Sequence, residues 1–408
     1  MLLFGAGLMI SSLARLLSID LGIQSDKVLA MQINLPRSKY GTAAGASRTY
    51  PGKKAWTVRP EKMAFIDQVL RRIETLPGVV SAGVSSAPPL IEGWAQQRAI
   101  SLEGRLERAD GRKRYAAFVS ITPRYFETMG MRLLKGRHFT DRDREGAPGV
   151  AIASESMVRA YWPNEDPIGK RVTRIAERGV SIEDEGVYEI VGIVSDAKTS
   201  AEGGLRWTIF IPIDQQGRRY SEVGGDRLAL FLNVLVRTSG DPSAMAAAVR
   251  AIIKEVDPDQ LVEQVATMKQ IISRQFSARN FAMVLLSLFA GLALVLSAAG
   301  IYGVMAYAVT QRTHEIGVRM ALGASRRDVL EMVIRRGMKF ALIGVAVGLA
   351  GALATTHLLK SLLYEITPTD PLTAAIVTLL LIGVAFLACY IPARRATKVD
   401  PMVALRCE

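Results

Sequence analysis

Three stretches near the C-terminus carry no charged side chain, and each is long enough to cross a membrane. They cover residues 281–311, 340–359 and 371–393. A helix rises 1.5 Å per residue, so about 20 apolar residues span the roughly 30 Å of hydrocarbon in a bilayer. The sequence therefore predicts three membrane-spanning helices in the last third of the chain.

The N-terminus opens on a fourth apolar stretch, in which 14 uncharged residues precede Arg15. As a helix this stretch covers about 21 Å, which is less than a full crossing. A secretory signal would place basic residues ahead of its apolar part and a small-x-small cleavage site soon after it, and neither is evident. We therefore expect residues 1–17 to form a partial first transmembrane helix.

The basic residues beside these stretches predict the orientation of the chain. Residues 311–337 hold six basic and three acidic side chains, and the tail 394–408 holds four basic ones, whereas Lys360 is the single basic residue between the last two stretches. Basic side chains collect on the cytoplasmic side of a membrane. We expect residues 311–337 and 394–408 in the cytoplasm and residues 18–278 outside it.

Composition limits the remaining function classes. The 408 residues carry a net charge of +13, which could indicate nucleic acid, but much of the basic clustering flanks the apolar stretches and is therefore a topology signal. The two cysteines, Cys389 and Cys407, lie in the last stretch and the tail, so the outer segment has no disulfide and no thiol chemistry. We predict no nucleic-acid partner.

The outer segment contains two β-α-β patterns separated by more than 130 residues. The first has strands at 27–35 and 79–88 around a helix beginning near Pro60, after a polar Gly/Ser/Pro-rich insert that ends at Val58. The second has a strand before Asp241, a helix opening on Asp241-Pro242, and a further strand. This repetition predicts one split β-α-β sandwich, formed by residues 18–90 and 227–267.

The intervening residues 91–226 are predicted as an inserted, strand-rich subdomain with a compact body of its own. Alternating apolar patterns and turn residues indicate strands at 98–104, 114–122, 187–197 and 207–213, and a helix at 153–162. Residues 268–278 continue without Gly or Pro into the membrane part, residues 279–408, and are predicted as a stiff helical stalk. The expected fold class is an α-helical membrane protein of four spans with an α+β extracytoplasmic domain.

Motifs for catalysis are missing from the sequence. GxxxxGK[ST], HExxH, CxxC and GxSxG are all absent, and His138, His314 and His357 are remote from one another and from both cysteines. We therefore predict no catalytic residue, no cofactor and no metal, and an energy source on another chain. A membrane-anchored enzyme stays open as an alternative, and an acidic cleft in the structure would favour it.

The basic segment 311–337 is predicted to form two short amphipathic helices. Ile316 and Met320 share one helical face beside Glu315 and Arg319, whose spacing of four permits an ion pair. Gly323 can end the first helix. Ser325 and Asp328 have the spacing of a capping box that starts the second. By periodicity alone, this is a helix pair on the lipid surface.

Small residues recur in the spans at helical spacing, at positions 300 and 303 in one stretch and 344, 348 and 352 in the next. Such spacing lets helix backbones approach closely, although glycine is common in membrane helices generally. The sequence leaves a dedicated helix-packing or dimer seam and ordinary usage equally open. The residues concerned are Gly300, Gly303, Gly344, Gly348 and Ala352.

Two regions resemble a known family. AAGIYGVMAYAVTQRTHEIGVRMALGASRRDVLEMVIRRG and the ending YIPARRATKVDPMVALR are similar to the FtsX-like permease domain of MacB-type ABC transporters. VAIASESMVRAYWPNEDPIGKRV, followed by YEIVGIVSDAK, resembles the MacB periplasmic core domain. The opening LLFGAGLMISSLARLLSIDLGI resembles the start of the second half of duplicated orphan permeases of acidobacterial type. We therefore expect either a fragment or the second half of a longer permease.

The resemblance implies a permease of the bacterial inner membrane that passes ATPase-driven helix motion to its outer domain for export or efflux. The implied partners are membrane lipid, a cytoplasmic ABC-type ATPase, a second permease unit (a homodimer or the other half of a duplicated permease) and an extracytoplasmic protein. An FtsX-like regulator that recruits or activates such a protein is the alternative. Resemblance places the ATPase contact at Glu315, Ile316, Gly317, Arg319, Met320, Ala321, Leu322, Gly323 and Ala324.

Overall fold

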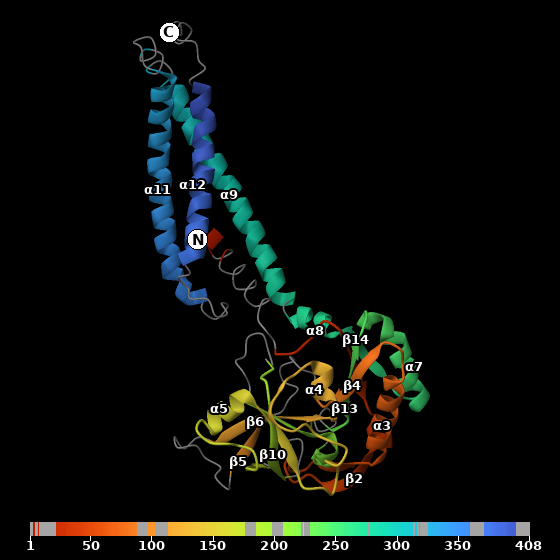
Figure 1. Cartoon of the computed structure of the whole chain (residues 1–408). Helices are drawn as coiled ribbons and strands as arrows, with labels where there is room; N and C mark the ends of the chain where they lie inside the picture. The colour runs from red at the N-terminus through yellow and green to blue at the C-terminus, as the bar shows by residue number, and fades with distance from the viewer. Residues whose placement is uncertain are drawn as a thin grey trace. The chain divides into compact units, whose positions relative to one another are not determined.

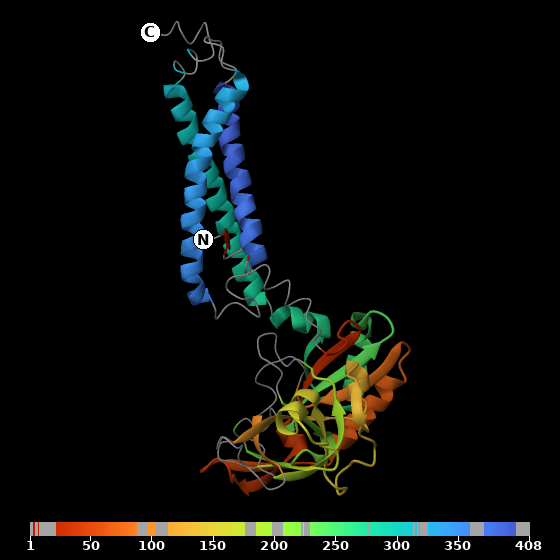
Figure 2. The ribbon, with the colours of Figure 1, turned by 60° about the vertical axis from the view of Figure 1, so that its left-hand side comes forward.

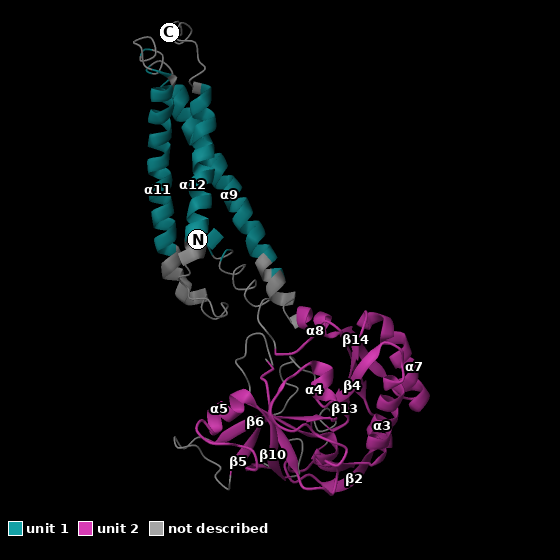
Figure 3. Ribbon diagram, viewed as in Figure 1, with its two compact units in different colours: residues 1–19, 277–408 teal, residues 20–276 magenta. Residues whose placement is uncertain are grey.

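A computed structural model describes residues 3–4, 7, 22–87, 97–102, 113–175, 185–197, 207–221, 223, 229–275, 277–312, 315, 318, 325–359 and 371–396. It consists of two compact units (Figure 3). Unit 1 comprises Met1–Ile19 and Ser277–Glu408, and unit 2 comprises Asp20–Phe276.

Unit 2 contains the split β-α-β arrangement, with strands from both ends of the outer segment in one sheet. They run in the order β4-β13-β1-β14, and each neighbouring pair is antiparallel. The pairing predicted between the two β-α-β patterns is therefore found. The elements are β1 (Val28–Asn34), α3 (Glu61–Glu74), β4 (Val79–Ser85), β13 (Phe231–Thr238), η2 (Pro242–Met245), α7 (Ala246–Val256) and β14 (Val262–Thr267).

Helix α3 covers one face of these strands because its apolar residues recur at helical spacing. Phe65, Ile66, Val69 and Ile73 are all buried in the core beneath the sheet. Lys62 lies on the same buried side. Its ammonium donates one hydrogen bond to the carbonyl oxygen of Ala229 at 2.8 Å and another to Gln216 Oε1 at 3.2 Å. A buried charge needs such partners, because an unsatisfied one is strongly destabilising.

The intervening segment adds seven strands to the same sheet, among them β5, β6 and β10 (Figure 1). Its parallel pairs are β10 with β8 and β11 with β6. The strands and the helix α5 predicted here are confirmed. The elements are β5 (Gln97–Leu102), β6 (Arg114–Ile121), α4 (Tyr125–Met129), β7 (Leu133–Gly136), β8 (Val150–Ser154), α5 (Glu155–Tyr161), β9 (Arg171–Arg174), β10 (Gly186–Val194), β11 (Thr208–Pro212) and η1 (Ile213–Gln215).

This inserted segment differs from the expectation in one respect, because it is not a body apart. Strand β6 joins β4 where Ser85 pairs with Ile121. Strand β1 alternates between two cores: its residues 29, 31 and 33 pack beneath α3, whereas Val28 and Ala30 pack with Phe126 of the insert. Because side chains of a strand point to opposite faces in turn, a strand buried on both faces needs covering on both. The insert provides the second cover.

The polar stretch before residue 58, predicted as a Gly/Ser/Pro-rich insert, forms regular structure. It contains α2 (Arg37–Tyr40), β2 (Gly41–Ala46) and β3 (Lys54–Val58), and β12 (Arg219–Ser221) completes a second sheet in the order β12-β3-β2. The stretch GTAAGA has too few large side chains to show a strand period. Pairing with β12, more than 150 residues away, supplies what the local pattern lacks.

The predicted stalk falls on two described helical segments with residue 276 between them. Helix α8 (Met268–Gln275) belongs to unit 2 and α9 (Ser277–Gln311) to unit 1, and residue 276 lies outside the described residues. An unbroken helix from residue 268 onward therefore stays a prediction.

Unit 1 is built from the long helices α9, α11 (Arg326–Leu359) and α12 (Pro371–Ala396), which lie side by side in Figures 1 and 2. Within the described residues, Val284–Gln311 and Ala375–Arg395 are long and apolar enough to cross a membrane. Large apolar side chains on these helices face outward, as suits lipid: Leu296 is 72% exposed and Leu379 is 69% exposed. The layout of four spans stays a prediction, because residues 1–17 are described at positions 3, 4 and 7 alone.

Candidate functional site

The predicted ATPase contact is described at one of its nine residues. Glu315 lies in a helical turn and is exposed. The other eight lie outside the described residues, so the ion pair of Glu315 with Arg319 and the helix end at Gly323 stay predictions. Those eight are Ile316, Gly317, Arg319, Met320, Ala321, Leu322, Gly323 and Ala324.

The capping box predicted at the start of the second helix is confirmed. The backbone N–H of Ser325 donates to Asp328 Oδ2 at 2.9 Å, its hydroxyl donates to the same oxygen at 2.7 Å, and the N–H of Asp328 donates to Ser325 Oγ at 3.3 Å. The hydrogen bond from the Ser325 hydroxyl, followed by the one from its backbone N–H, holds the pKa of Asp328 below its usual value. They set the first residue of α11 at Arg326.

A charged hollow follows the cap along α11. Its volume is about 450 Å³, and it is lined by acidic and basic side chains with one thioether. Such a mixed, charged surface at the start of a helix can meet a partner through ion pairs. The lining residues are Asp328, Glu331, Met332, Arg335, Arg336 and Lys339.

Gly337 of α11 lies close to side chains of both neighbouring helices. A Cβ built on this residue would lie 2.5 Å from Cys389 Sγ of α12 and 3.1 Å from Met305 Sδ of α9. Near the same end of the helices, Arg395 of α12 donates to the hydroxyl of Tyr302 of α9 at 3.0 Å. Gly337 was predicted only as the last residue of the segment 311–337. It lies seven residues before Gly344, a spacing that places both glycines on one face of a helix.

A substitution tests this contact. Gly337→Ala is expected to destabilise the three helices by about 1–3 kcal/mol relative to Gly383→Ala, because the added methyl must displace the Cys389 sulfur. Gly383→Ala is the control, because it replaces a helical glycine with alanine and so raises helix propensity equally. A Cβ at position 383 would meet no described atom within 4 Å. Thermal unfolding of the full chain in detergent, followed by far-UV circular dichroism, measures the difference. Equal midpoints for the two variants would contradict the contact.

The five small residues singled out in the sequence make no such contact within the described chain. A Cβ on Gly300, Gly303, Gly344 or Gly348 would meet no described atom within 4 Å, and the side chain of Ala352 lies outside the described residues. Close packing of α9 on α11 at these positions is therefore not found. A seam against another chain stays a prediction.

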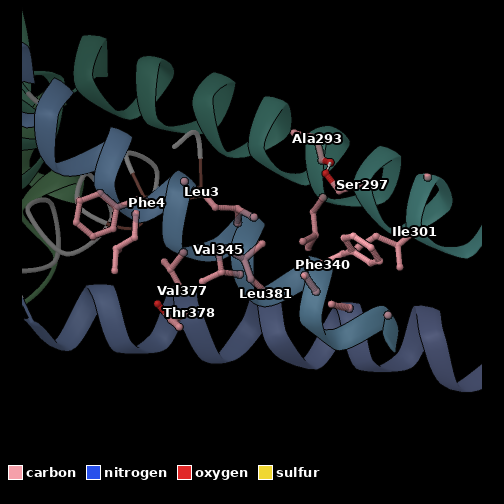
Figure 4. Close-up of a pocket in the computed structure, with 18 of the residues that line it drawn as sticks. Leu3, Phe4, Ala293, Ser297, Ile301, Phe340, Val345, Val377, Thr378 and Leu381 are labelled. Carbon is pink, nitrogen blue, oxygen red and sulfur yellow. Dashed lines mark hydrogen bonds between the residues drawn. The ribbon is translucent and has the colours of Figure 1, made fainter. Parts of the chain in front are cut away.

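Three of these glycines, Gly300, Gly344 and Gly348, line an apolar cavity of about 710 Å³ between α9, α11 and α12 (Figure 4). Its described lining carries no charged side chain. The hydroxyl of Ser297 donates to the carbonyl oxygen of Ala293, one helical turn back, at 2.7 Å. The cavity therefore suits apolar side chains or acyl chains rather than an ion.

Groups of side chains that could bind a metal are not found among the described residues. No three His, Cys, Asp or Glu side chains there could hold a metal ion together. His138 packs on the ring of Phe126, with centroids 5.5 Å apart, and burial lowers its pKa.

The fold is that of a two-part protein, with an α+β unit joined in sequence to a unit of long apolar helices. A family model described as MacB-like periplasmic core domain matches residues 35–253, and one described as FtsX-like permease C-terminal matches residues 287–401. The chain belongs to this family of ABC transporter permeases. It is accordingly a membrane protein with an extracytoplasmic domain.

Two relatives are named macrolide export ATP-binding/permease protein MacB. The protein of Mannheimia succiniciproducens is 26% identical over 70% of this chain and 42% of its own length. The protein of Azoarcus sp. is 25% identical over 100% of this chain and 56% of its own length. The chain thus spans about half the length of these relatives. A solved structure of the periplasmic region of MacB from Actinobacillus actinomycetemcomitans matches 64% of this chain and 98% of its own, at 14% identity and a TM-score of 0.36.

Proposed function

We propose that this chain is the permease subunit of a MacB-type ABC transporter, in which a separate cytoplasmic ATPase moves the helices and the helices act on the outer domain for export. The observation that supports this most is the start of α11. There a charged hollow, lined by residues on both sides of Gly337 in the sequence, lies on the part of α11 that packs against both α9 and α12. A displacement of the first turns of α11 is passed to α9 through this contact, and α9 follows α8 after a single residue.

The proposal includes the location and partners of the chain. It is a multi-pass protein of the bacterial inner membrane with residues 18–278 outside the cytoplasm, and residues 315–324 contact the ATPase. A second permease unit packs along the small residues of α9 and α11, where the described chain leaves room for added side chains. An extracytoplasmic partner protein meets the outer domain.

Loss of one carboxylate tests the ATPase contact. Glu315→Ala is expected to weaken the complex with the ATPase about 30-fold or more, because truncating one partner of a buried charged contact costs about 2–5 kcal/mol. The measurement is ATP hydrolysis by the co-reconstituted ABC-type ATPase as the permease concentration is varied. The concentration for half-maximal stimulation should rise by that factor.

The matched control is Glu263→Ala, which removes the same group from an exposed position on β14 of unit 2. It should leave the stimulation unchanged. If Glu315→Ala stimulated hydrolysis as the unaltered chain does, segment 311–337 would be a lipid-surface helix pair and the proposed coupling would fail.

A further inference from the structure

The second, three-stranded sheet of unit 2 carries an unusual concentration of basic side chains. Six Lys or Arg residues and no Asp or Glu occur from residue 37 to residue 59. The third strand, β12, adds Arg219. Charge of one sign without interspersed carboxylates raises the local potential and attracts anions.

The turn between β2 and β3 is held in one conformation by its own hydrogen bonds. The N–H of Ser47 donates to the carbonyl oxygen of Lys53 at 2.8 Å, and the N–H of Lys53 donates to that of Tyr50 at 3.2 Å. Gly52 has a φ of 75°, in the left-handed region that favours glycine. This turn carries three exposed cations, Arg48, Lys53 and Lys54, on a preformed backbone.

Some cations of this sheet are neutralised within the protein, and others are not. Lys39 pairs with the buried Asp257 at 2.7 Å. Arg59 donates to the hydroxyl oxygen of Thr42, a neutral acceptor, at 2.8 Å. Within the part of the chain that the structure describes, Lys53, Lys54 and Arg59 form no ion pair. Their charge remains available to an external anion.

The position and surface character of this sheet restrict its partner. Within unit 2 the sheet and α8 lie at opposite ends, so it is remote from the point where the chain continues into α9 (Figures 1 and 2). Residues 37–59, all described, include no exposed large apolar side chain, and the guanidinium of Arg37 lies 5.0 Å from the centroid of the Trp56 ring. Protein interfaces depend on apolar or aromatic anchors, and the two aromatic side chains nearest the hairpin, Tyr50 and Trp56, are half-buried rather than exposed.

We propose that the β2–β3 hairpin, through Lys53 and Lys54, binds a polyanion that carries repeated phosphate groups. Phosphate suits this surface because arginine can bind it through two parallel hydrogen bonds and lysine as a point charge. A flexible chain of phosphates can follow the exposed strands without needing an apolar pocket. This site is independent of the ATPase contact proposed above.

The test measures binding of fluorescein-labelled linear polyphosphate to the full chain in nanodiscs of zwitterionic lipid, at several salt concentrations. The double variant Lys53→Gln, Lys54→Gln is expected to bind about ten-fold more weakly at low salt. Each phosphate contact contributes about 0.7–0.9 to the slope of log affinity against log salt in nucleic acids, so the slope should fall by about 1.5. Fluorescence of the native tryptophans and unchanged ATPase stimulation confirm that the variant is folded and coupled.

The control is Arg250→Gln, Lys254→Gln, which removes two exposed cations from α7 of the same unit. It should change neither the affinity nor the slope by more than the error of the titration. An equal loss in both double variants would mean general attraction to a basic protein and would overturn the site. Equal binding of polyglutamate would overturn the choice of phosphate, and binding to anionic vesicles in place of polyphosphate would assign the hairpin to a lipid surface.

Discussion

Replacing Phe126 with alanine is expected to lower the free energy of unfolding of unit 2 by about 3–5 kcal/mol, as is typical of a large side chain removed from a packed core. Phe126 is fully buried. Its ring centroid lies 5.0 Å from that of Phe210, 5.7 Å from that of Tyr125 and 6.3 Å from that of Phe139. Truncation leaves a cavity that these three rings cannot close without leaving their own contacts.

The same variant tests whether the inserted segment and the split sandwich unfold together. Phe126 belongs to a core that also contains Val28, Ala30 and Leu235 of the sandwich. We therefore expect one urea transition for unit 2, shifted to lower urea with an unchanged slope. All four tryptophans occur at positions 56, 94, 162 and 207, so their fluorescence in the full chain reports this unit.

Phe126→Leu is the control, because it keeps an apolar side chain and should recover much of the loss. A second transition appearing in Phe126→Ala, with the sandwich unfolding as in the unaltered chain, would show that the insert is a separate body after all.

The buried ammonium of Lys62 is expected to make unit 2 more stable as the pH rises. Burial lowers the pKa of Lys62 from 10.5 to about 8, and Asp214 opposes this shift. Between these two values the unfolded chain holds a proton that the folded chain has released, so the free energy of unfolding increases with pH. Below pH 8 both states are protonated, and the cost of burying the charge is present in full.

Comparison with Lys62→Met isolates this contribution, because the other titrating groups are shared. From pH 7 to pH 10 the unfolding free energy of the unaltered chain should rise by about 2 kcal/mol relative to the variant. Urea titrations followed by tryptophan fluorescence provide the measurement. A difference that stays constant over this range would mean that Lys62 is not buried as a charged group below pH 8.

Features that local chemistry controls could be predicted from the order of the residues. Absence of charge over 20 or more residues defines an apolar helix wherever it occurs, and α9 and α12 follow. The short apolar run of β1 and the helical spacing of Phe65, Ile66, Val69 and Ile73 identify their elements without knowledge of the rest of the chain. The capping box of Ser325 and Asp328 is equally local, because its hydrogen bonds join residues three apart.

Tertiary structure alone decided the features that depend on partners distant in the sequence. The strands β2 and β3 have a weak period of their own and take their order from β12. The insert joins the sandwich because it covers the second face of β1. The residues of β1 alone do not show which part of the chain covers that face. Gly337, rather than Gly344 or Gly348, is the glycine that contacts other helices, because helix packing depends on what lies opposite each glycine. Cys389 and Met305 lie opposite Gly337, whereas no described atom lies within 4 Å of a Cβ built on Gly344 or Gly348.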